Sequence, residues 1–277
     1  MKQAIRSFGF ALAHHLFRVD VRKAGKTFAA PPTKKEAIES LLDALSPVVP
    51  QCAMMRLGPS SDGGYVLPDD LDGVTACFSP GVSGVSGFEW DCAERGMEVF
   101  MADKSVDHPA EQHARFHFLK KYIGATTNDD FITLDQWVTD SEVTPEGDLL
   151  LQMDIEGYEW ETLLSVSDAL LRRCRILVME LHSLDQLWNQ PFYSIVSRAL
   201  FKVLQNHACV HIHPNNCSES IRYLGLEFPP VMEFTFLRKD RIKECHDATS
   251  FPHPLDVNNA KHPTLVLPKC WYRMSQE

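Results

Sequence analysis

Between Val74 and Lys239 the chain alternates short apolar segments with longer amphipathic ones, and this pattern limits the fold more than any other feature. Seven of the short segments have the length and the β-branched and aromatic content of strands. They are Val74–Pro80, Glu98–Asp103, Ala114–Gly124, Leu149–Asp154, Arg175–His182, Ala208–Pro214 and Pro230–Lys239. Helical patterns at 87–96, 159–173 and 192–207 separate several of them. The alternation predicts an α/β fold with a seven-stranded, mainly parallel sheet that helices cover on both faces.

The sequence predicts a division of the chain into three parts. Residues 1–50 form an N-terminal helical extension, with a capping-box spacing at Thr33 and Glu36 and a helix that ends near Ser46. Residues 51–245 form the main domain, in which a turn-rich hairpin or loop holds Tyr65 extended and ITLDQWV is a short connection. Residues 246–277 form an extended C-terminal segment that packs on this domain.

Charge and cysteine content limit the partners and the compartment. The 277-residue chain has a net charge of −10, which argues against a nucleic acid partner because phosphate binding needs a basic surface. The first 30 residues carry +5, so an N-terminal helix there either packs on the domain or contacts an anionic membrane. No run is long enough to span a bilayer. Eight cysteines occur without any CxxC pair, which favours free thiols in a reducing cytoplasm.

The sequence GDLLLQMDIEGYEW places two carboxylates and a glycine directly after an apolar strand. Ligands of an open α/β sheet bind outside the carboxyl ends of its strands. We therefore expect Asp154 and Glu156 to emerge at that edge, while Gly157 turns the backbone into the next helix. The alternative is that Asp154 or Glu156 only caps this helix.

A glycine-rich loop and an acidic residue follow the first two predicted strands. Gly81, Gly84 and Gly87 precede a helix, and Asp103 ends the second strand about 22 residues after Gly81. A loop of this kind lets backbone amides approach a ligand, and an acid at this position can accept hydrogen bonds from both hydroxyls of a ribose. The spacing departs from GxGxxG, which a dinucleotide pyrophosphate favours. S-adenosylmethionine has no phosphate, so the looser loop favours it as the nucleoside cofactor.

Several motifs together resemble the FkbM-type S-adenosylmethionine-dependent methyltransferases. The resemblance runs from about Arg56 to Lys239, and its most specific part is DIEGYE with ITLDQWV upstream and ILVMELH downstream. It also includes DGGYVLPDDL, CFSPGVSGVSGFE, VFMADKSVD and VHIHPNN, although the glycine segment departs from the commoner family form. It implies a Rossmann-like methyltransferase fold with one antiparallel strand, and methyl transfer to a hydroxyl of a sugar or another small molecule.

The resemblance also implies positions for the cofactor. It places Gly81 and Asp103 at S-adenosylmethionine, with Asp103 on the ribose. Tyr122 and Ile123, with Gly124, would lie near the adenine. Asp62, Gly63 and Gly64 would line the cleft, and Asp154 would border the cofactor at the next strand end.

Methyl transfer to a hydroxyl needs a group that accepts its proton or a metal ion that lowers its pKa. Glu180 and His182 share one strand face by the two-residue period, as do His211 and His213, and Asp154 ends the strand before Glu180. His182 is the first choice for the base. The alternative is a divalent cation held by Asp154, Glu180 and His182, which would also orient a sugar diol. Any one of these histidines could instead be a core residue bonded to backbone.

The sequence therefore predicts an S-adenosylmethionine-dependent O-methyltransferase that acts on a small polar acceptor, a sugar or a glycoconjugate precursor. Two other classes stay open. One is a noncatalytic module that binds a nucleoside, and the other is a metal-dependent hydrolase that uses the Asp, Glu and His cluster. The catalytic prediction needs Asp103, Asp154 and His182 at the same edge of the sheet, so coordinates that separate them would refute it.

Overall fold

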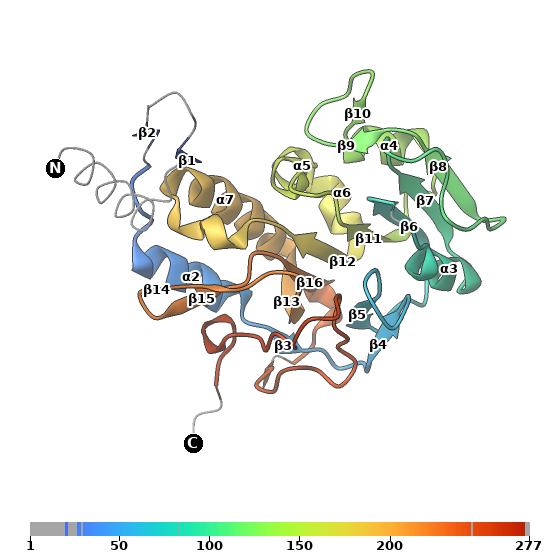
Figure 1. Cartoon of the computed structure of the whole chain (residues 1–277). Helices are drawn as coiled ribbons and strands as arrows, with labels where there is room; N and C mark the ends of the chain where they lie inside the picture. The colour runs from blue at the N-terminus through green and yellow to red at the C-terminus, as the bar shows by residue number, and fades with distance from the viewer. Residues whose placement is uncertain (1–19, 22–26, 29, 83, 245, 275–277) are drawn as a thin grey trace.

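A computed structural model describes residues 20–21, 27–28, 30–82, 84–244 and 246–274, and its centre is a seven-stranded sheet (Figure 1). The strands lie in the order β13-β16-β12-β11-β6-β7-β8. In this sheet β16 runs antiparallel to both of its neighbours, and the other pairs are parallel. The bounds are β6 (Val74–Pro80), β7 (Glu98–Ala102), β8 (Phe116–Leu119), β11 (Asp148–Met153), β12 (Cys174–Leu181), β13 (His207–Pro214) and β16 (Met232–Arg238). The predicted fold is confirmed, including the single antiparallel strand.

The direction of the chain through the sheet reverses between β6 and β11. From β6 the chain moves outward to β7 and β8, and it then returns to β11 on the other side of β6 before it continues to β12. Such a reversal leaves a crevice at the carboxyl ends of the two central strands, where open α/β sheets bind ligands. The fold thus directs attention to the residues that follow β6 and β11.

Five helices pack on one face of the sheet (Figure 1). They are α2 (Lys35–Leu45), α4 (Leu134–Asp140), α5 (Glu159–Ser165), α6 (Asp168–Arg173) and α7 (Gln190–Asn206). Leu177 and Met179 of β12 face them, and the buried side of α2, from Ile38 to Leu45, belongs to the same apolar cluster. Alternate residues of one strand thus enter this core, as the period of two requires.

The other face is covered by shorter elements. These are α3 (Gly87–Glu94), the hairpin of β4 (Met54–Leu57) and β5 (Tyr65–Pro68), and β3 (Val48–Val49), which pairs with β17 (His246–Asp247). Ile176 and Val178 of β12 pack beneath them in a second apolar cluster. The remaining elements are β1 (Asp20–Val21), β2 (Thr27–Phe28), β9 (Tyr122–Ile123), β10 (Phe131–Ile132), β14 (Ile221–Tyr223), β15 (Leu226–Phe228), η1 (Leu184–Trp188), η2 (Lys239–Arg241) and η3 (Lys269–Trp271).

The structure differs from the sequence prediction at several local points. The capping box is wrong: Lys34 is the N-cap of α2, and the Thr33 hydroxyl instead donates to the Leu187 carbonyl at 2.7 Å. The ITLDQWV connection contains helix α4, which Thr133 caps by accepting from the Gln136 amide. The predicted helix 159–173 is two helices, because Ser167 caps a new start.

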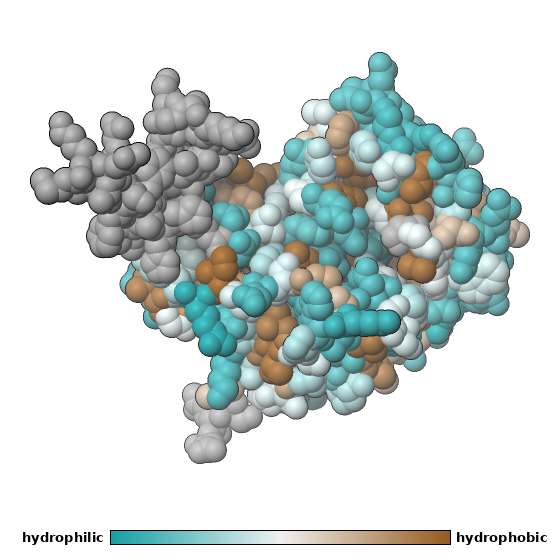
Figure 2. Space-filling view, in the orientation of Figure 1, coloured by the Kyte–Doolittle hydropathy of each residue, from teal (hydrophilic) through white to brown (hydrophobic). Residues whose placement is uncertain are grey.

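Residues 1–19 and most of the basic N-terminal segment lie outside the described residues, so the structure says nothing of the expected helix or membrane contact there. Among the described helices, none is long and apolar enough to cross a membrane. On the face in Figure 2, apolar side chains form small areas separated by polar ones. Seven cysteines at described positions are free thiols, and Cys77 and Cys209 are buried.

Candidate active site

The two strands at the reversal are joined by contacts between their carboxyl ends. The Asp154 amide donates to the Pro80 carbonyl at 3.3 Å. Gly81 has a φ of +93°, and a Cβ at this position would lie 1.6 Å from the Asp154 carbonyl oxygen. Only glycine allows this close approach. The glycine loop and Asp154 therefore form one packed unit at the edge where a ligand is expected.

Asp103 lies beside the same loop. Its Oδ2 accepts from the Val82 amide at 3.1 Å, and its Oδ1 accepts from the Ser105 amide at 2.6 Å. Val82 follows Gly81, so these contacts connect Asp103 to Asp154 through the loop. Asp103 and Asp154 thus occur at one edge of the sheet, and the separation that would refute the catalytic prediction is not found.

The other predicted cofactor residues surround this edge in different ways. Tyr122 is 39% exposed with its ring 5.4 Å from that of Phe131, whereas the Ile123 side chain is buried in the core. Asp62 is exposed, and its Oδ1 accepts from the Asn259 side chain at 3.0 Å. Gly64 is buried where a Cβ would lie 2.1 Å from the Pro59 carbonyl oxygen. The Tyr122 and Asp62 side chains are therefore accessible, and Gly64 allows the close approach of the backbone.

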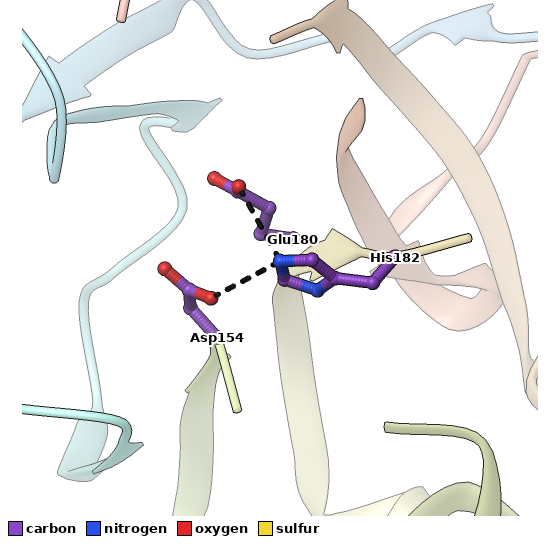
Figure 3. A group of neighbouring side chains, drawn as sticks. All are labelled: Asp154, Glu180 and His182. Carbon is purple, nitrogen blue, oxygen red and sulfur yellow. Dashed lines mark ion pairs between the residues drawn. The ribbon is translucent and has the colours of Figure 1, made fainter. Parts of the chain in front are cut away.

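Asp154, Glu180 and His182 converge at the carboxyl ends of β11 and β12 (Figure 3). The His182 Nε2 atom lies 4.0 Å from Asp154 Oδ1 and 3.8 Å from Glu180 Oε1. One donor atom from each residue lies within 4.8 Å of the other two, so the three could hold one metal ion. Asp154 Oδ1 is buried and makes no hydrogen bond to a described residue. The three side chains thus lie together in the structure.

Glu159, which the sequence analysis did not select, lies behind this cluster. Its side chain is fully buried, and its Oε1 accepts from His182 Nδ1 at 3.0 Å. The same oxygen accepts from the backbone amides of Ile155 at 3.0 Å and Gly157 at 3.1 Å. The ring nitrogen that faces the cluster is therefore Nε2. The signal in the sequence was an acidic residue in the first turn after the glycine, where a solvent-exposed helix face is the usual interpretation.

The alternative that Asp154 or Glu156 only caps the next helix is wrong. The N-cap of α5 is Tyr158, and no side chain caps it. Glu156 instead points its Oε2 to within 3.5 Å of His182 Nε2 from the solvent side. Both carboxylates are thus directed at the histidine.

The charges of the cluster change the proton affinity of its members. Burial raises the pKa of Asp154 and of Glu180, and the neighbouring carboxylates raise both further. Burial lowers the pKa of His182, but the hydrogen bond to Glu159 and the nearby Asp154 and Glu180 carboxylates raise it more. The site therefore attracts positive charge.

The cluster continues as a row of polar residues across four neighbouring strands. Glu233 of β16 lies directly opposite Glu180 of β12 on one side and His213 of β13 on the other. Side chains of such partners are neighbours on one face of the sheet. Glu180, Glu233 and His213 are each at most 6% exposed. The row links the cluster to the side of the sheet that is farthest from the glycine loop.

His211 and His213, which the sequence grouped with His182, contact Asp256 instead. His211 Nε2 lies 2.8 Å from Asp256 Oδ1, and His213 Nδ1 lies 3.4 Å from Asp256 Oδ2. Asp256 belongs to the C-terminal segment, which the sequence could not place. The two histidines therefore attach this segment to the sheet rather than complete the cluster around His182.

Asn259 brings the C-terminal segment to the edge of the cluster. Its Nδ2 donates to Glu233 Oε1 at 2.8 Å and to Asp62 Oδ1 at 3.0 Å. Asn216 fixes the segment further, since its side chain donates to the carbonyls of Ala260 and His262 at 3.0 and 2.9 Å. Residues 256–262 thus border the cluster on the side opposite the glycine loop.

A cavity of about 570 Å³ lies elsewhere, between β8 and α4. Phe100, His117 and Trp137 line part of it, and none of the cluster residues does. Size alone therefore does not mark the reaction site. The convergence of charged side chains at the strand ends is the stronger indication.

Comparison with known proteins agrees with the resemblance. Residues 93–221 match the profile of the methyltransferase FkbM domain, which includes Asp103, Tyr122, Asp154, Glu180 and His182 and begins after the glycine loop. No curated protein sequence matches the chain significantly.

Two solved structures are also similar to the chain. One is a proposed methyltransferase from Thermoplasma acidophilum, with a TM-score of 0.32, 9% identity and coverage of 78% of this chain and 79% of that one. Another is a proposed RNA methyltransferase from Pyrococcus horikoshii, with a TM-score of 0.31, 10% identity and coverage of 60% and 77%. We assign the fold from the strand order rather than from these two matches.

The family profile and the strand order favour a methyltransferase over the nucleoside-binding module and the hydrolase. Residues 93–221 therefore match a methyltransferase FkbM domain, and this match supports an S-adenosylmethionine-dependent methyltransferase.

Proposed function

We propose that the enzyme is an O-methyltransferase that methylates a hydroxyl of a small polar acceptor, a sugar or a glycoconjugate precursor, at a divalent cation. The observation that carries this proposal is the convergence of Asp154, Glu180 and His182 on one point at the carboxyl edge of the sheet. Two carboxylates and an imidazole are suitable ligands for a divalent metal, and a cation would satisfy the buried Asp154 Oδ1, which accepts no hydrogen bond from a described residue.

The cofactor belongs on the β6, β7 and β8 side in this proposal. Gly81 and the backbone of its loop would receive the methionine part, Asp103 the ribose, and Tyr122 the adenine, while Asp154 borders both cofactor and cation. When bound, S-adenosylmethionine supplies a methyl group that its sulfonium already activates. The task of the protein is then to hold the acceptor hydroxyl in line with that methyl group.

The acceptor side lies toward β16 and the C-terminal segment. A bound cation would lower the pKa of a hydroxyl and could orient a diol. Asp62, Glu156 and Asn259 border this side, and carboxylate and amide groups can accept hydrogen bonds from hydroxyl donors. Because this wall is rich in carboxylates, we propose a neutral or amino-bearing acceptor rather than a phosphorylated one.

The cation accounts for the geometry of His182 better than the predicted role of a free base does. Glu159 occupies Nδ1, so Nε2 is the ring atom directed at the two carboxylates. A histidine held through Nδ1 by a carboxylate is the usual arrangement of a metal ligand. His182 as the base, without a metal, is the alternative that the experiment below separates.

The test is methyl transfer by the purified protein to neutral sugars, amino sugars, sugar phosphates and simple amines, with Mn²⁺ or with EDTA. We expect transfer to a hydroxyl of a neutral or amino sugar that EDTA abolishes. Asp154→Asn should lose Mn²⁺ binding, and the exposed Asp129→Asn should keep it. Full activity in EDTA would refute the cation, and transfer only to amines or to no acceptor would refute O-methylation.

We also propose the domain division at residues 50 and 245 and a cytoplasmic location. The free thiols at described positions support a reducing compartment. The contacts of residues 256–262 with Asp62 and Glu233 support a C-terminal segment that packs on the methyltransferase domain.

A further inference from the structure

We propose that Glu159 is a positioning residue that fixes both His182 and the 154–158 loop in the arrangement a cation needs. This inference rests on the proposed cation site. Glu159 does not face the cation itself, because its bonded oxygen is directed at the far ring nitrogen of His182. Glu159 would therefore affect cation binding only through His182 and the loop.

One oxygen of Glu159 joins two separate parts of the chain. Oε1 accepts from His182 Nδ1, which follows β12, and from the amides of Ile155 and Gly157, which follow β11. The Glu159 side chain is fully buried, and its Oε2 makes no hydrogen bond to a described residue. A buried carboxylate is costly unless donors surround it. Because three donors bind this one oxygen, we infer that the buried carboxylate serves to position His182 and the loop after β11.

The first consequence concerns the tautomer and orientation of His182. A proton on Nδ1 that Glu159 binds leaves the Nε2 lone pair free for a cation. The ring is then turned so that Nε2 lies 3.8 Å from Glu180 Oε1 and 4.0 Å from Asp154 Oδ1. Without the acceptor at Nδ1, the ring could rotate or take the other tautomer, and either change would remove one ligand.

The second consequence concerns the loop that carries Glu156. Glu156 has a φ of +56° and Gly157 a φ of +101°. A glutamate in this left-handed region is strained, and such strain persists only where the surroundings hold it. The amides on either side of Glu156, those of Ile155 and Gly157, are the two that Glu159 binds. Glu159 therefore holds the strained residue with its carboxylate 3.5 Å from His182 Nε2.

A role in folding alone would make a different prediction from a role through His182. If Glu159 only stabilises the fold, its loss should lower cation affinity by the same factor whether His182 is present or not. If it acts in part through His182, its loss should lower cation affinity by a smaller factor once His182 is gone. A double-mutant cycle measures this difference.

The experiment is Mn²⁺ titration of the full chain by electron paramagnetic resonance for wild type, Glu159→Gln, His182→Ala and the double variant. Glutamine keeps the shape and can still accept hydrogen bonds, so the fold should survive, and thermal melting checks this. Glu161→Gln is the matched control, because Glu161 is an exposed residue of the same helix whose Oε1 accepts from the Ala125 amide.

We expect Glu159→Gln to weaken Mn²⁺ binding by about 10–100-fold, the usual effect of removing a carboxylate behind a histidine ligand. Glu161→Gln should bind as wild type, and Glu159→Gln should weaken binding less in the His182→Ala background than in wild type, because only the loop contacts remain to be lost. Unchanged affinity in Glu159→Gln, or equal losses in both backgrounds, would overturn the inference.

A second readout separates this inference from the cation proposal. The proton on His182 Nδ1 can be followed by long-range ¹⁵N–¹H correlation, and it should be protected in wild type and lost to exchange in Glu159→Gln. If wild type binds no Mn²⁺ but this proton still depends on Glu159, the cation proposal fails while the positioning role stands. If the proton is the same in both proteins, the positioning role fails.

Discussion

Replacing Gly81 with alanine should disrupt the contact that joins the glycine loop to Asp154. The added Cβ would lie 1.6 Å from the Asp154 carbonyl oxygen and 2.7 Å from its carbonyl carbon. Both are backbone atoms, so no side-chain rotation can relieve the overlap. The Asp154 amide also donates a hydrogen bond to the Pro80 carbonyl, and this bond resists movement of the end of β11 away from β6.

Gly96 provides a matched control. Its φ of +90° is close to the +93° of Gly81, but a Cβ there would meet nothing within 4 Å. An alanine at such a positive φ destabilises the folded state by about 1–2 kcal/mol. Its lower flexibility in the unfolded chain offsets about 0.4–1 kcal/mol of this cost. Gly96→Ala should therefore lose about 1 kcal/mol of unfolding free energy.

Gly81→Ala carries the same backbone cost and adds the overlap. Overpacking costs about 1–3 kcal/mol, so the total loss should be about 2–4 kcal/mol. For a chain of this size each kcal/mol lowers the Tm by about 2–4 °C. Urea and thermal unfolding of both variants measure the difference. Equal losses in Gly81→Ala and Gly96→Ala would show that the close approach to Asp154 does not exist.

Three further predictions follow from the contacts of the site. Asp103→Asn should weaken S-adenosylhomocysteine binding about 10–100-fold in calorimetry, since charge-assisted hydrogen bonds contribute about 1.5–3 kcal/mol, and Asp107→Asn in the same loop should not. Burial opposes a low pKa for Asp256, but the hydrogen bond from His211 and the ion pair with His213 outweigh it and hold this pKa well below its usual range. Its contribution to stability is thus present above about pH 4 and lost as the pH falls, so urea unfolding should show a steeper loss below pH 5 in wild type than in Asp256→Asn. Asn259→Ala removes the donor that Glu233 and Asp62 share and should cost about 1–3 kcal/mol of unfolding free energy. Asn258→Ala, which loses one exposed contact with Thr264, should cost less than about 0.5 kcal/mol, and similar losses would contradict the bridge.

The sheet could be predicted from the sequence because its strands are buried on both faces. Runs such as Leu149–Leu151 have no other stable place in a domain of this size, and the polar residues that end them mark the edge. The convergence of Asp154, Glu180 and His182 followed from the same rule, since carboxyl ends of neighbouring parallel strands meet at one edge. The apolar strand pattern and the polar residues that end it were therefore enough to predict the fold and the place where these three side chains meet.

The contacts that support the centre could not be predicted, because they depend on segments without periodicity. Nothing in the sequence indicates that Asp256 and Asn259 return to β13 and β16, since an extended segment can follow many paths. Thr33 shows the same limit. The local pattern predicted that its hydroxyl would cap a helix, but the hydroxyl donates to the distant Leu187 carbonyl instead. Glu159 could not be selected from the sequence, because its burial depends on hydrogen-bond donors that follow two different strands, β11 and β12.

The contact between Gly81 and Asp154 would make the two proposed binding events interdependent. The loop predicted to receive the cofactor and the aspartate predicted to hold the cation share a backbone contact, so neither can shift alone. A ligand that moves the loop therefore alters the position of one metal donor. Thermodynamic reciprocity then requires S-adenosylhomocysteine and Mn²⁺ to change each other's dissociation constants by the same factor.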